Sequence, residues 1–183
     1  MYSYRITKYN PAYRDDIAYT MKDEWTAISD IGKPQYGFLT ANNYLRVEDN
    51  YWATISYLLK LCHINSLRMK EIEKHHELHV FFTQNKFFNP TNIEKAIQNN
   101  TQIGIDEIEI VLRLCLREEM WCKLEGKNNT FIHFGYDYYM FFCTEIEHKI
   151  DANFIPEGVY IENFQSPYVR NIFSDPPKAI DRL

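Results

Sequence analysis

The sequence predicts an α+β fold: a single domain over residues 1–183, with a mainly antiparallel sheet and three to four helices. Two observations predict this class. Segments with a 3.6-residue apolar period and segments with a two-residue period both occur, without the regular alternation of a parallel βαβ protein. In addition, the turn-forming tetrapeptide GKNN separates two strand-like segments by the short distance typical of a β-hairpin.

The N-terminal part is predicted to form a strand, a long connection and a helix. Residues 2–9 (YSYRITKY) alternate in polarity, which indicates a half-buried strand that the following NP pair ends. Residues 12–39 show no period, and a connection of this length either packs as a defined structure or carries function. Thr40 is a suitable cap for a helix over residues 41–62. Its apolar positions follow helical spacing: Leu45, Trp52, Ile55, Leu59 and Cys62.

The middle of the chain is predicted to contain a hairpin and two shorter helices. Residues 66–72 and 78–83 have the composition of strands on either side of the polar KHHE. The tetrapeptides TNIE, from Thr91, and DEIE, from Asp106, have the spacing of a capping box at the start of a helix. The inward apolar positions of these two helices are Ile93, Ala96 and Ile97, and then Ile108, Val111, Leu112 and Cys115.

The aromatic-rich segment after GKNN is predicted to be one strand of a hairpin that pairs residues 119–124 with 131–143. On a continuous strand its side chains alternate between a core face and a half-exposed face that carries rings on either side of Asp137. His133 and Asp137 would then lie about 13 Å apart, at roughly 3.3 Å per residue, which is too far for a catalytic dyad.

Three elements are predicted for the C-terminal part. Thr144 with Glu147 has the spacing of a cap for a last short helix. Residues 159–161 offer a final strand, and residues 175–183 (DPPKAIDRL) are expected to be a loose tail.

Composition and charge exclude several classes of function. Hydrophobic residues make up 45% and charged residues 25%, as in soluble globular proteins. The formal net charge of −5 argues against binding to nucleic acid, which requires a surplus of Lys and Arg on one face. Only 6 Gly are present and no GxSxG occurs, which disfavours a phosphate-binding loop and a nucleophilic enzyme. The 16% of aromatic residues favours a surface that binds protein.

Several features favour a cytoplasmic protein. The start, MYSYRITKYNP, has no long apolar run, so neither a signal peptide nor a membrane anchor is expected there. No stretch approaches 18 apolar residues, so no membrane span is expected. The cysteines lack CxxC spacing and lie in apolar segments, which is typical of buried free thiols in a reducing compartment; they are Cys62, Cys115, Cys122 and Cys143.

The segment EKHHELH contains the candidate metal ligands. On a helix, His75 and His79 would share one face at i, i+4, a spacing that zinc sites use. The motif is one residue short of HExxH, and the turn expected here removes the helical spacing. A solvated hairpin tip is therefore the preferred interpretation, and no cofactor is expected.

Acidic residues recur beside aromatic ones in three segments, residues 23–30, 118–121 and 133–139. Carboxylates would attract and orient a basic protein partner, while Tyr and Trp would supply buried anchoring area. We therefore interpret these segments as a candidate binding surface for such a partner, plausible for an inhibitor of the immunity type. The candidate residues are Asp23, Glu24, Trp25, Asp30, Glu118, Glu119, Trp121, His133, Asp137 and Tyr139.

Two alternative functions remain compatible with the sequence. A carboxylate-based hydrolase would use Asp137 with Glu118 or Glu119, provided that two of these side chains converge at the floor of a deep pocket. A small-ligand-binding protein would require an enclosed aromatic pocket.

Three longer segments carry a family resemblance: YRITKYNPAYRD at 4–15, DEWTAISDIGK at 23–33 and REEMWCKLEGKNNTFIHFGYDYYMFF at 117–142. They resemble a family of uncharacterised bacterial cytoplasmic proteins of similar length, over most of the chain apart from residues 63–105. The resemblance implies no activity, because no catalytic residue is established for that family. In composition, its small, acidic, aromatic-rich members are similar to the immunity proteins that neutralise bacterial toxins.

Overall fold

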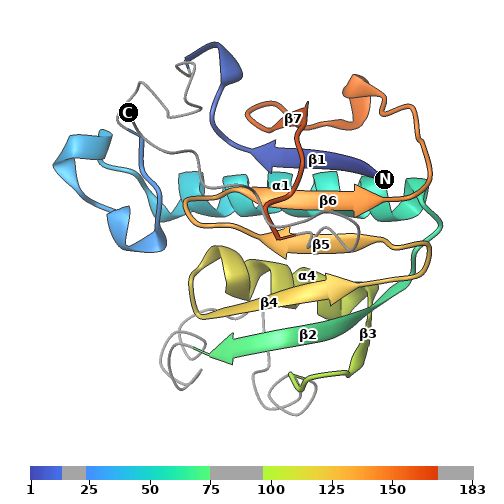
Figure 1. The fold of residues 1–183 in the computed structure, drawn as a ribbon. Helices are drawn as coiled ribbons and strands as arrows, with labels where there is room; N and C mark the ends of the chain where they lie inside the picture. Colours follow the sequence, from blue (N-terminus) through green and yellow to red (C-terminus); the bar gives the residue numbers. More distant parts are fainter. Residues whose placement is uncertain (14–23, 75–96, 169–183) are drawn as a thin grey trace, which may run out of the picture.

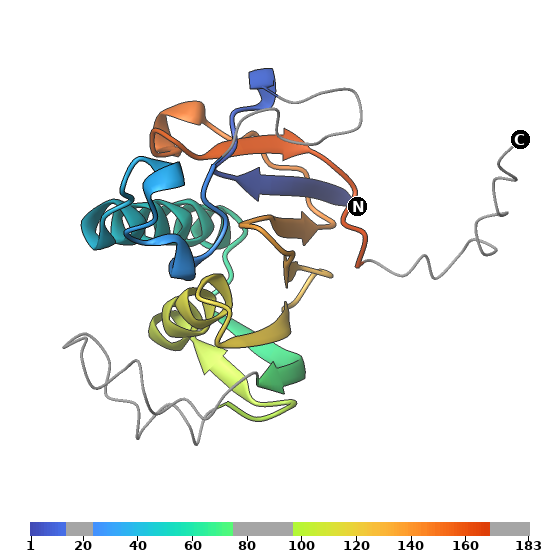
Figure 2. The same cartoon turned by 90° about the vertical axis from the view of Figure 1, so that its left-hand side faces the viewer.

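The computed structural model describes residues 1–13, 24–74 and 97–168. In this part the chain forms one seven-stranded sheet in the order β3-β2-β4-β5-β6-β1-β7, with every neighbouring pair antiparallel (Figures 1 and 2). The strands are β1 (Tyr2–Thr7), β2 (Ser66–Lys74), β3 (Gln102–Gly104), β4 (Met120–Glu125), β5 (Phe131–Phe134), β6 (Met140–Thr144) and β7 (Tyr160–Asn163). The helices are α1 (Ala41–Leu61) and α4 (Ile105–Leu116), with 3-10 turns η1 (Pro11–Tyr13), η2 (Ile28–Asp30), η3 (Pro34–Tyr36) and η4 (Ala152–Phe154).

The predicted α+β class with an antiparallel sheet is confirmed, while the prediction of three to four helices exceeds the two α-helices of the described residues. The helices expected over 41–62 and from Asp106 are both present. The helix expected at Thr144 is wrong, because this residue ends β6 and its hydroxyl accepts a hydrogen bond from the Ile146 N–H within a local turn. The second strand of the KHHE hairpin, the TNIE helix and the C-terminal tail lie outside the described residues.

The aromatic-rich segment is a hairpin rather than the single strand that the alternation predicts. Strands β5 and β6 pair antiparallel, and a tight turn joins them, in which the Tyr139 N–H donates to the Tyr136 carbonyl at 3.1 Å. The Gly135 N–H donates to the Tyr139 carbonyl at 2.7 Å beside this turn. The two central residues of this turn, Asp137 (φ 55°) and Tyr138 (φ 61°), are both left-handed. This is the type I′ geometry, whose twist matches that of the flanking strands. The candidate acid Asp137 therefore lies at a hairpin tip.

The core lies between the sheet and the two helices, which cover the same face of it (Figure 2). Helix α1 begins at Thr40, whose hydroxyl accepts from the Asn43 N–H, and it buries one stripe of side chains against the strands. Burial of large apolar side chains stabilises such a core by about 1.5–3 kcal/mol each. The buried side chains include Tyr51, Ile55, Leu58 and Leu59 of α1, Ile108 and Leu112 of α4, and Ile6, Met69, Leu124, Ile132 and Phe142 of the sheet.

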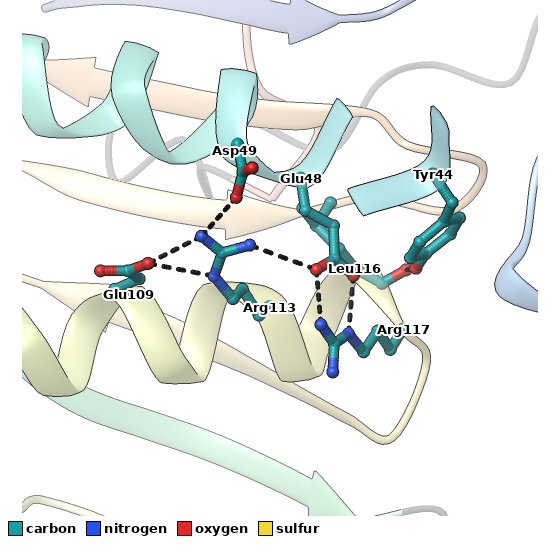
Figure 3. Close-up of polar contacts among 7 residues, drawn as sticks. All are labelled: Tyr44, Glu48, Asp49, Glu109, Arg113, Leu116 and Arg117. Atoms are coloured by element: carbon teal, nitrogen blue, oxygen red, sulfur yellow. Dashed lines mark hydrogen bonds and ion pairs between the residues drawn. The ribbon is translucent and has the colours of Figure 1, made fainter. Parts of the chain in front are cut away.

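A buried ion-pair network joins α1 to α4 (Figure 3). The Glu48 carboxylate is fully buried and accepts from Nε and Nη2 of Arg117, each at 2.7 Å. Arg113 also donates to Glu48, at 3.3 Å, and reaches Asp49 and Glu109 at 2.8 and 2.7 Å. Five charged groups, from α1, from α4 and from the residue that follows α4, thereby hold the C-terminal end of α4 in a fixed position.

The opposite face of the sheet is crossed by residues 164–168, which follow β7 (Figure 1). The Ser166 N–H donates to the Ser3 hydroxyl at 3.0 Å, and the Ser166 hydroxyl is hydrogen-bonded to Nδ1 of His133 at 3.0 Å. The Tyr168 ring then lies 5.9 Å from the Trp121 ring. This strap covers part of the face that the sequence predicts to be half-exposed.

Two further predictions concern the cysteines and the membrane. All four cysteines are free, and Cys62, Cys122 and Cys143 are buried as predicted, while Cys115 is half-buried. Within the described residues, neither helix combines the length and the apolar character that a membrane span needs.

Candidate functional site

The hairpin tip after β5 packs against the segment that begins at Glu24, so two of the three predicted acidic–aromatic segments adjoin. The Trp25 ring lies 4.9 Å from the Tyr138 ring, edge to face, and 5.4 Å from the Tyr44 ring of α1. Such edge-to-face contacts stabilise by about 0.5–1.5 kcal/mol beyond the area they bury. More than one hundred residues separate Trp25 from Tyr138 along the chain, yet they form one unit with the first turns of α1.

Tyr138 holds the left-handed turn in place through its burial. Its side chain is 4% exposed and lies edge to face against Tyr44 and Tyr51. The Tyr51 hydroxyl donates to the Tyr138 carbonyl at 2.5 Å, which fixes the backbone of the turn to α1. Burial raises the pKa of Tyr138 above its ordinary value. A left-handed tyrosine is unfavourable by itself, so this packing and this hydrogen bond determine where Asp137 is presented.

A buried lysine lies beneath the same cluster. Nζ of Lys8 is 3.3 Å from a Glu24 oxygen and 4.1 Å from the ring centres of both Tyr9 and Trp25. Burial lowers the pKa of Lys8 to about 8, against the opposing influence of the nearby carboxylates, of which Glu24 is the strongest and Asp137 is another. The Lys8 ammonium therefore compensates part of the negative charge of Glu24 and of the nearby Asp137.

Asp30 has a structural position. Its carboxylate is buried and accepts from the Thr26 N–H at 2.8 Å, the Ala27 N–H at 3.1 Å and Lys33 Nζ at 2.7 Å. Burial alone would raise the pKa of Asp30, but the hydrogen bonds from Lys33 and the two N–H groups outweigh it and lower the pKa. Asp30, which the sequence predicts to belong to a partner-binding surface, thus holds the turn around η2 with its side chain.

A hollow of about 490 Å³ opens beside the hairpin tip. Its floor is formed by buried or half-buried apolar side chains from α4, β4 and β5, and its rim carries the exposed Glu118 and Asp137. Three aromatic residues form its sides, among them Tyr136, which is 84% exposed. We name this feature the acidic hollow, and its lining is Thr26, Cys115, Leu116, Glu118, Met120, Trp121, Phe134, Gly135, Tyr136, Asp137, Tyr138 and Tyr139.

Glu118 reaches the rim because of the way α4 ends. The Glu118 N–H donates to the Cys115 carbonyl at 3.1 Å, and the Glu119 N–H to the Leu114 carbonyl at 3.0 Å. This is a Schellman motif with Glu118 in the left-handed position (φ 62°) that glycine usually occupies. The preceding Arg117 is held by the buried Glu48, so the position of Glu118 follows from the network in Figure 3. Glu119 does not line the hollow.

The aromatic sides of the hollow are fixed by polar contacts. Nε1 of Trp121 donates to the Phe134 carbonyl at 2.7 Å, which orients the indole across the start of the hairpin tip. The Tyr139 ring lies 5.5 Å from the Tyr9 ring, and the Arg5 guanidinium lies 5.5 Å from the centre of the Tyr139 ring.

His133 does not belong to this surface. His133 is 3% exposed and lies beneath the strap, where its Nδ1 is hydrogen-bonded to the Ser166 hydroxyl. Burial lowers the pKa of His133 to about 4, with a further contribution from the positive charge of Lys123. The face of this strand that the sequence predicts to be half-exposed is thus covered at His133, the residue that the sequence predicts to contact a partner.

Of the predicted site residues, six lie at or beside the acidic hollow: Glu24, Trp25, Glu118, Trp121, Asp137 and Tyr139. Asp23 lies outside the described residues. The sequence interpretation missed Lys8, although this residue lies two positions after the buried Ile6 and continues the same alternation. It also placed Tyr138 in a strand. The usual turn signal, Asn-Gly or Asp-Gly, is absent there, so the aromatic alternation concealed the turn.

The chemistry available at this surface is that of carboxylates and aromatic rings. Within residues 1–13, 24–74 and 97–168, no three His, Cys, Asp or Glu side chains are grouped to hold a metal ion. The candidate zinc pair, His75 and His79, lies outside these ranges. Comparisons with protein-family models, with curated proteins and with solved structures find no match to this chain. Function is therefore inferred from the chemistry of the site.

Proposed function

We propose that this protein is a non-enzymatic binding module for a basic protein partner, of the kind represented by immunity proteins that inhibit a basic bacterial toxin. The proposed contact surface consists of the acidic hollow with the adjoining Glu24 and Trp25. The observation that supports it best is the contact between Trp25 and Tyr138, which joins two acidic–aromatic segments into one surface.

The distribution of charge supports recognition of a basic partner. The acids that face the hollow are Glu118 and Asp137. Exposed carboxylates of this kind accelerate the encounter with a basic protein, and desolvated aromatic anchors then slow its dissociation.

The alternative of a carboxylate-based hydrolase receives less support. Its general acid would have to remain protonated near neutral pH, which requires burial or a closely placed second carboxylate. Both Asp137 and Glu118 are exposed residues at a rim, and the floor of the hollow between them is apolar. This arrangement favours docking of a side chain over hydrolysis.

Asp137→Asn is the most suitable test of this proposal. Asparagine tolerates the left-handed turn as well as aspartate does, so the change removes the charge and keeps the backbone. Trp25→Ala is less suitable, because Trp25 also packs against Tyr44 and Tyr138 and its loss would lower stability. Glu157→Gln, in an exposed loop before β7, is a matched control that removes one carboxylate elsewhere.

The experiment is affinity capture from the source cells, identification of the captured protein by mass spectrometry, and calorimetric titration of that purified protein. We expect a basic protein whose binding to Asp137→Asn is weaker by about 2 kcal/mol, the threshold for an anchor residue, with Glu157→Gln unchanged. Equal binding by Asp137→Asn and the wild type would refute the proposal. So would turnover in a hydrolase screen that Asp137→Asn abolishes.

A further inference from the structure

We propose that the acidic hollow is a subsite for one arginine side chain of the partner. This inference rests on the proposed function and adds to it the chemical group that enters the hollow. Three properties of the hollow lead to it: two carboxylates from different elements at the rim, aromatic sides, and an apolar floor.

The rim suits a planar cation with several donors. Glu118 follows α4 and Asp137 lies at the β5–β6 tip, so the two carboxylates approach the hollow from separate elements. A guanidinium presents five N–H donors in a rigid fork, which can serve one carboxylate in a bidentate manner and a second at the same time. An ammonium is a compact and strongly hydrated charge, which gains less from this arrangement.

The sides and the floor suit the rest of the arginine side chain. Guanidinium groups stack on aromatic faces, and Trp121, Tyr136 and Tyr139 line the hollow. The same chain already makes this contact on a neighbouring strand, where the Arg5 guanidinium lies 4.0 Å above the Phe164 ring. The three methylene groups of arginine would cover the apolar floor, which consists of Cys115, Leu116, Met120 and Phe134.

The hollow is held in shape before any ligand arrives. The buried Glu48–Arg117 pair fixes the backbone next to Glu118, and the Tyr51 hydroxyl fixes the turn that carries Asp137. Nε1 of the Trp121 indole donates a hydrogen bond to the Phe134 carbonyl of β5. Because these groups are already ordered, an arginine side chain would bind with little loss of conformational entropy in the protein.

The test uses the full chain and a small probe, Nα-acetyl-L-arginine amide, in an NMR titration that follows the indole N–H signal of Trp121. This signal is assigned with Trp121→Phe. The citrulline amide, which has the same shape without the charge, and the lysine amide are the comparison probes. The variants are Asp137→Asn and Glu118→Gln, with Glu157→Gln as the control.

We expect saturable shifts with the arginine probe at millimolar concentration, no saturation with citrulline, and weaker binding of lysine. Asp137→Asn and Glu118→Gln should each weaken arginine binding several-fold, and Glu157→Gln should leave it unchanged. Equal binding of citrulline or lysine, or no shift at tens of millimolar arginine probe, would overturn the arginine subsite. If the partner's binding still depended on Asp137, the proposed function would survive that failure. Conversely, arginine binding to the hollow together with a partner indifferent to Asp137→Asn would overturn only the proposed docking surface.

Discussion

The Glu48 carboxylate of α1 receives two hydrogen bonds of 2.7 Å from the Arg117 guanidinium at the end of α4, and both side chains are buried (Figure 3). Removal of one member of a buried pair leaves the other charge without compensation, which typically costs about 3–5 kcal/mol. We therefore expect Glu48→Ala to lower the free energy of unfolding by about this amount in urea denaturation.

The next residue of the same helix provides the control for this prediction. The Asp49 side chain is 64% exposed and pairs with Arg113. An exposed pair contributes about 0–1 kcal/mol, so Asp49→Ala should have a small effect. Equal losses of stability in Glu48→Ala and Asp49→Ala would contradict a special role for the buried pair. Replacement of both Glu48 and Arg117 by Met should recover much of the stability lost in Glu48→Ala.

His133 should make the protein sensitive to mild acid. Its pKa is lowered from 6.5 to about 4 in the folded state because burial disfavours the charged imidazole. Between these two values the unfolded chain binds more protons, so the free energy of unfolding falls as the pH decreases from 6.5 towards 4. At 1.36 kcal/mol per pKa unit, the loss is at most about 3 kcal/mol.

The measurement is urea denaturation at several pH values across this window. His133→Asn retains a polar group for Ser166 but does not titrate, so its stability should depend less on pH than that of the wild type. His63→Gln, at an exposed position after α1, should keep the wild-type dependence. A His133→Asn curve parallel to that of the wild type would show that other groups cause the acid sensitivity.

Two turns of the same kind explain which part of the hairpins could be predicted. In GKNN, Asn128 and Asn129 have φ values of 55° and 46°, and asparagine adopts this conformation readily, so local chemistry reveals the turn. At the second turn, Tyr138 adopts φ 61° because Trp25, Tyr44 and Tyr51 bury its ring. These partners are distant in sequence, so no local signal for this turn exists.

The candidate site divides in the same manner. The acidic and aromatic segments could be named from the sequence because residue type alone suggests their chemistry. Their contact through Trp25 could not be predicted, since it depends on how the connection before α1 folds back onto the β5–β6 tip. The covering of His133 was also missed, because Ser166 reaches it from a strap that has no strand or helix periodicity.

Lys8 should oppose the loss of stability that alkaline pH causes. Burial lowers its pKa from 10.5 to about 8, so in this interval Lys8 holds more protons in the unfolded chain than in the folded one. Lys8 alone should therefore add up to about 2 kcal/mol to the free energy of unfolding between about pH 8 and 9.5. Burial raises the pKa of the thiols of Cys62, Cys115 and Cys143, which lowers the free energy of unfolding in the same interval as cysteines of the unfolded chain ionise. Above about pH 10 the buried tyrosines, whose pKa values are raised, add to this loss as tyrosines of the unfolded chain ionise.

Lys8→Met tests this contribution. Methionine fills a similar volume between Tyr9 and Trp25 without a charge, so the variant should lose stability more steeply than the wild type between about pH 8 and 9.5 and should be at least as stable at neutral pH. Lys60→Met, at an exposed position of α1, should keep the wild-type dependence on pH. Equal slopes for Lys8→Met and the wild type would show that Lys8 makes no such contribution.

Glu118 should lower the free energy of unfolding through its left-handed backbone, while its carboxylate should contribute to binding at the acidic hollow. It occupies the left-handed position after α4, and His63 (φ 53°) occupies the equivalent position after α1, where the Ile64 N–H donates to the Leu59 carbonyl at 2.8 Å. Glycine at either site relieves about 1–2 kcal/mol of backbone strain in the folded state. It also raises the conformational entropy of the unfolded chain, which offsets about half of that gain. Glu118→Gly and His63→Gly should therefore both raise the free energy of unfolding by about 0.5–1 kcal/mol. Only Glu118→Gly should weaken binding of the arginine probe in the NMR titration, and equal weakening by His63→Gly would show that the rim carboxylate is not the cause.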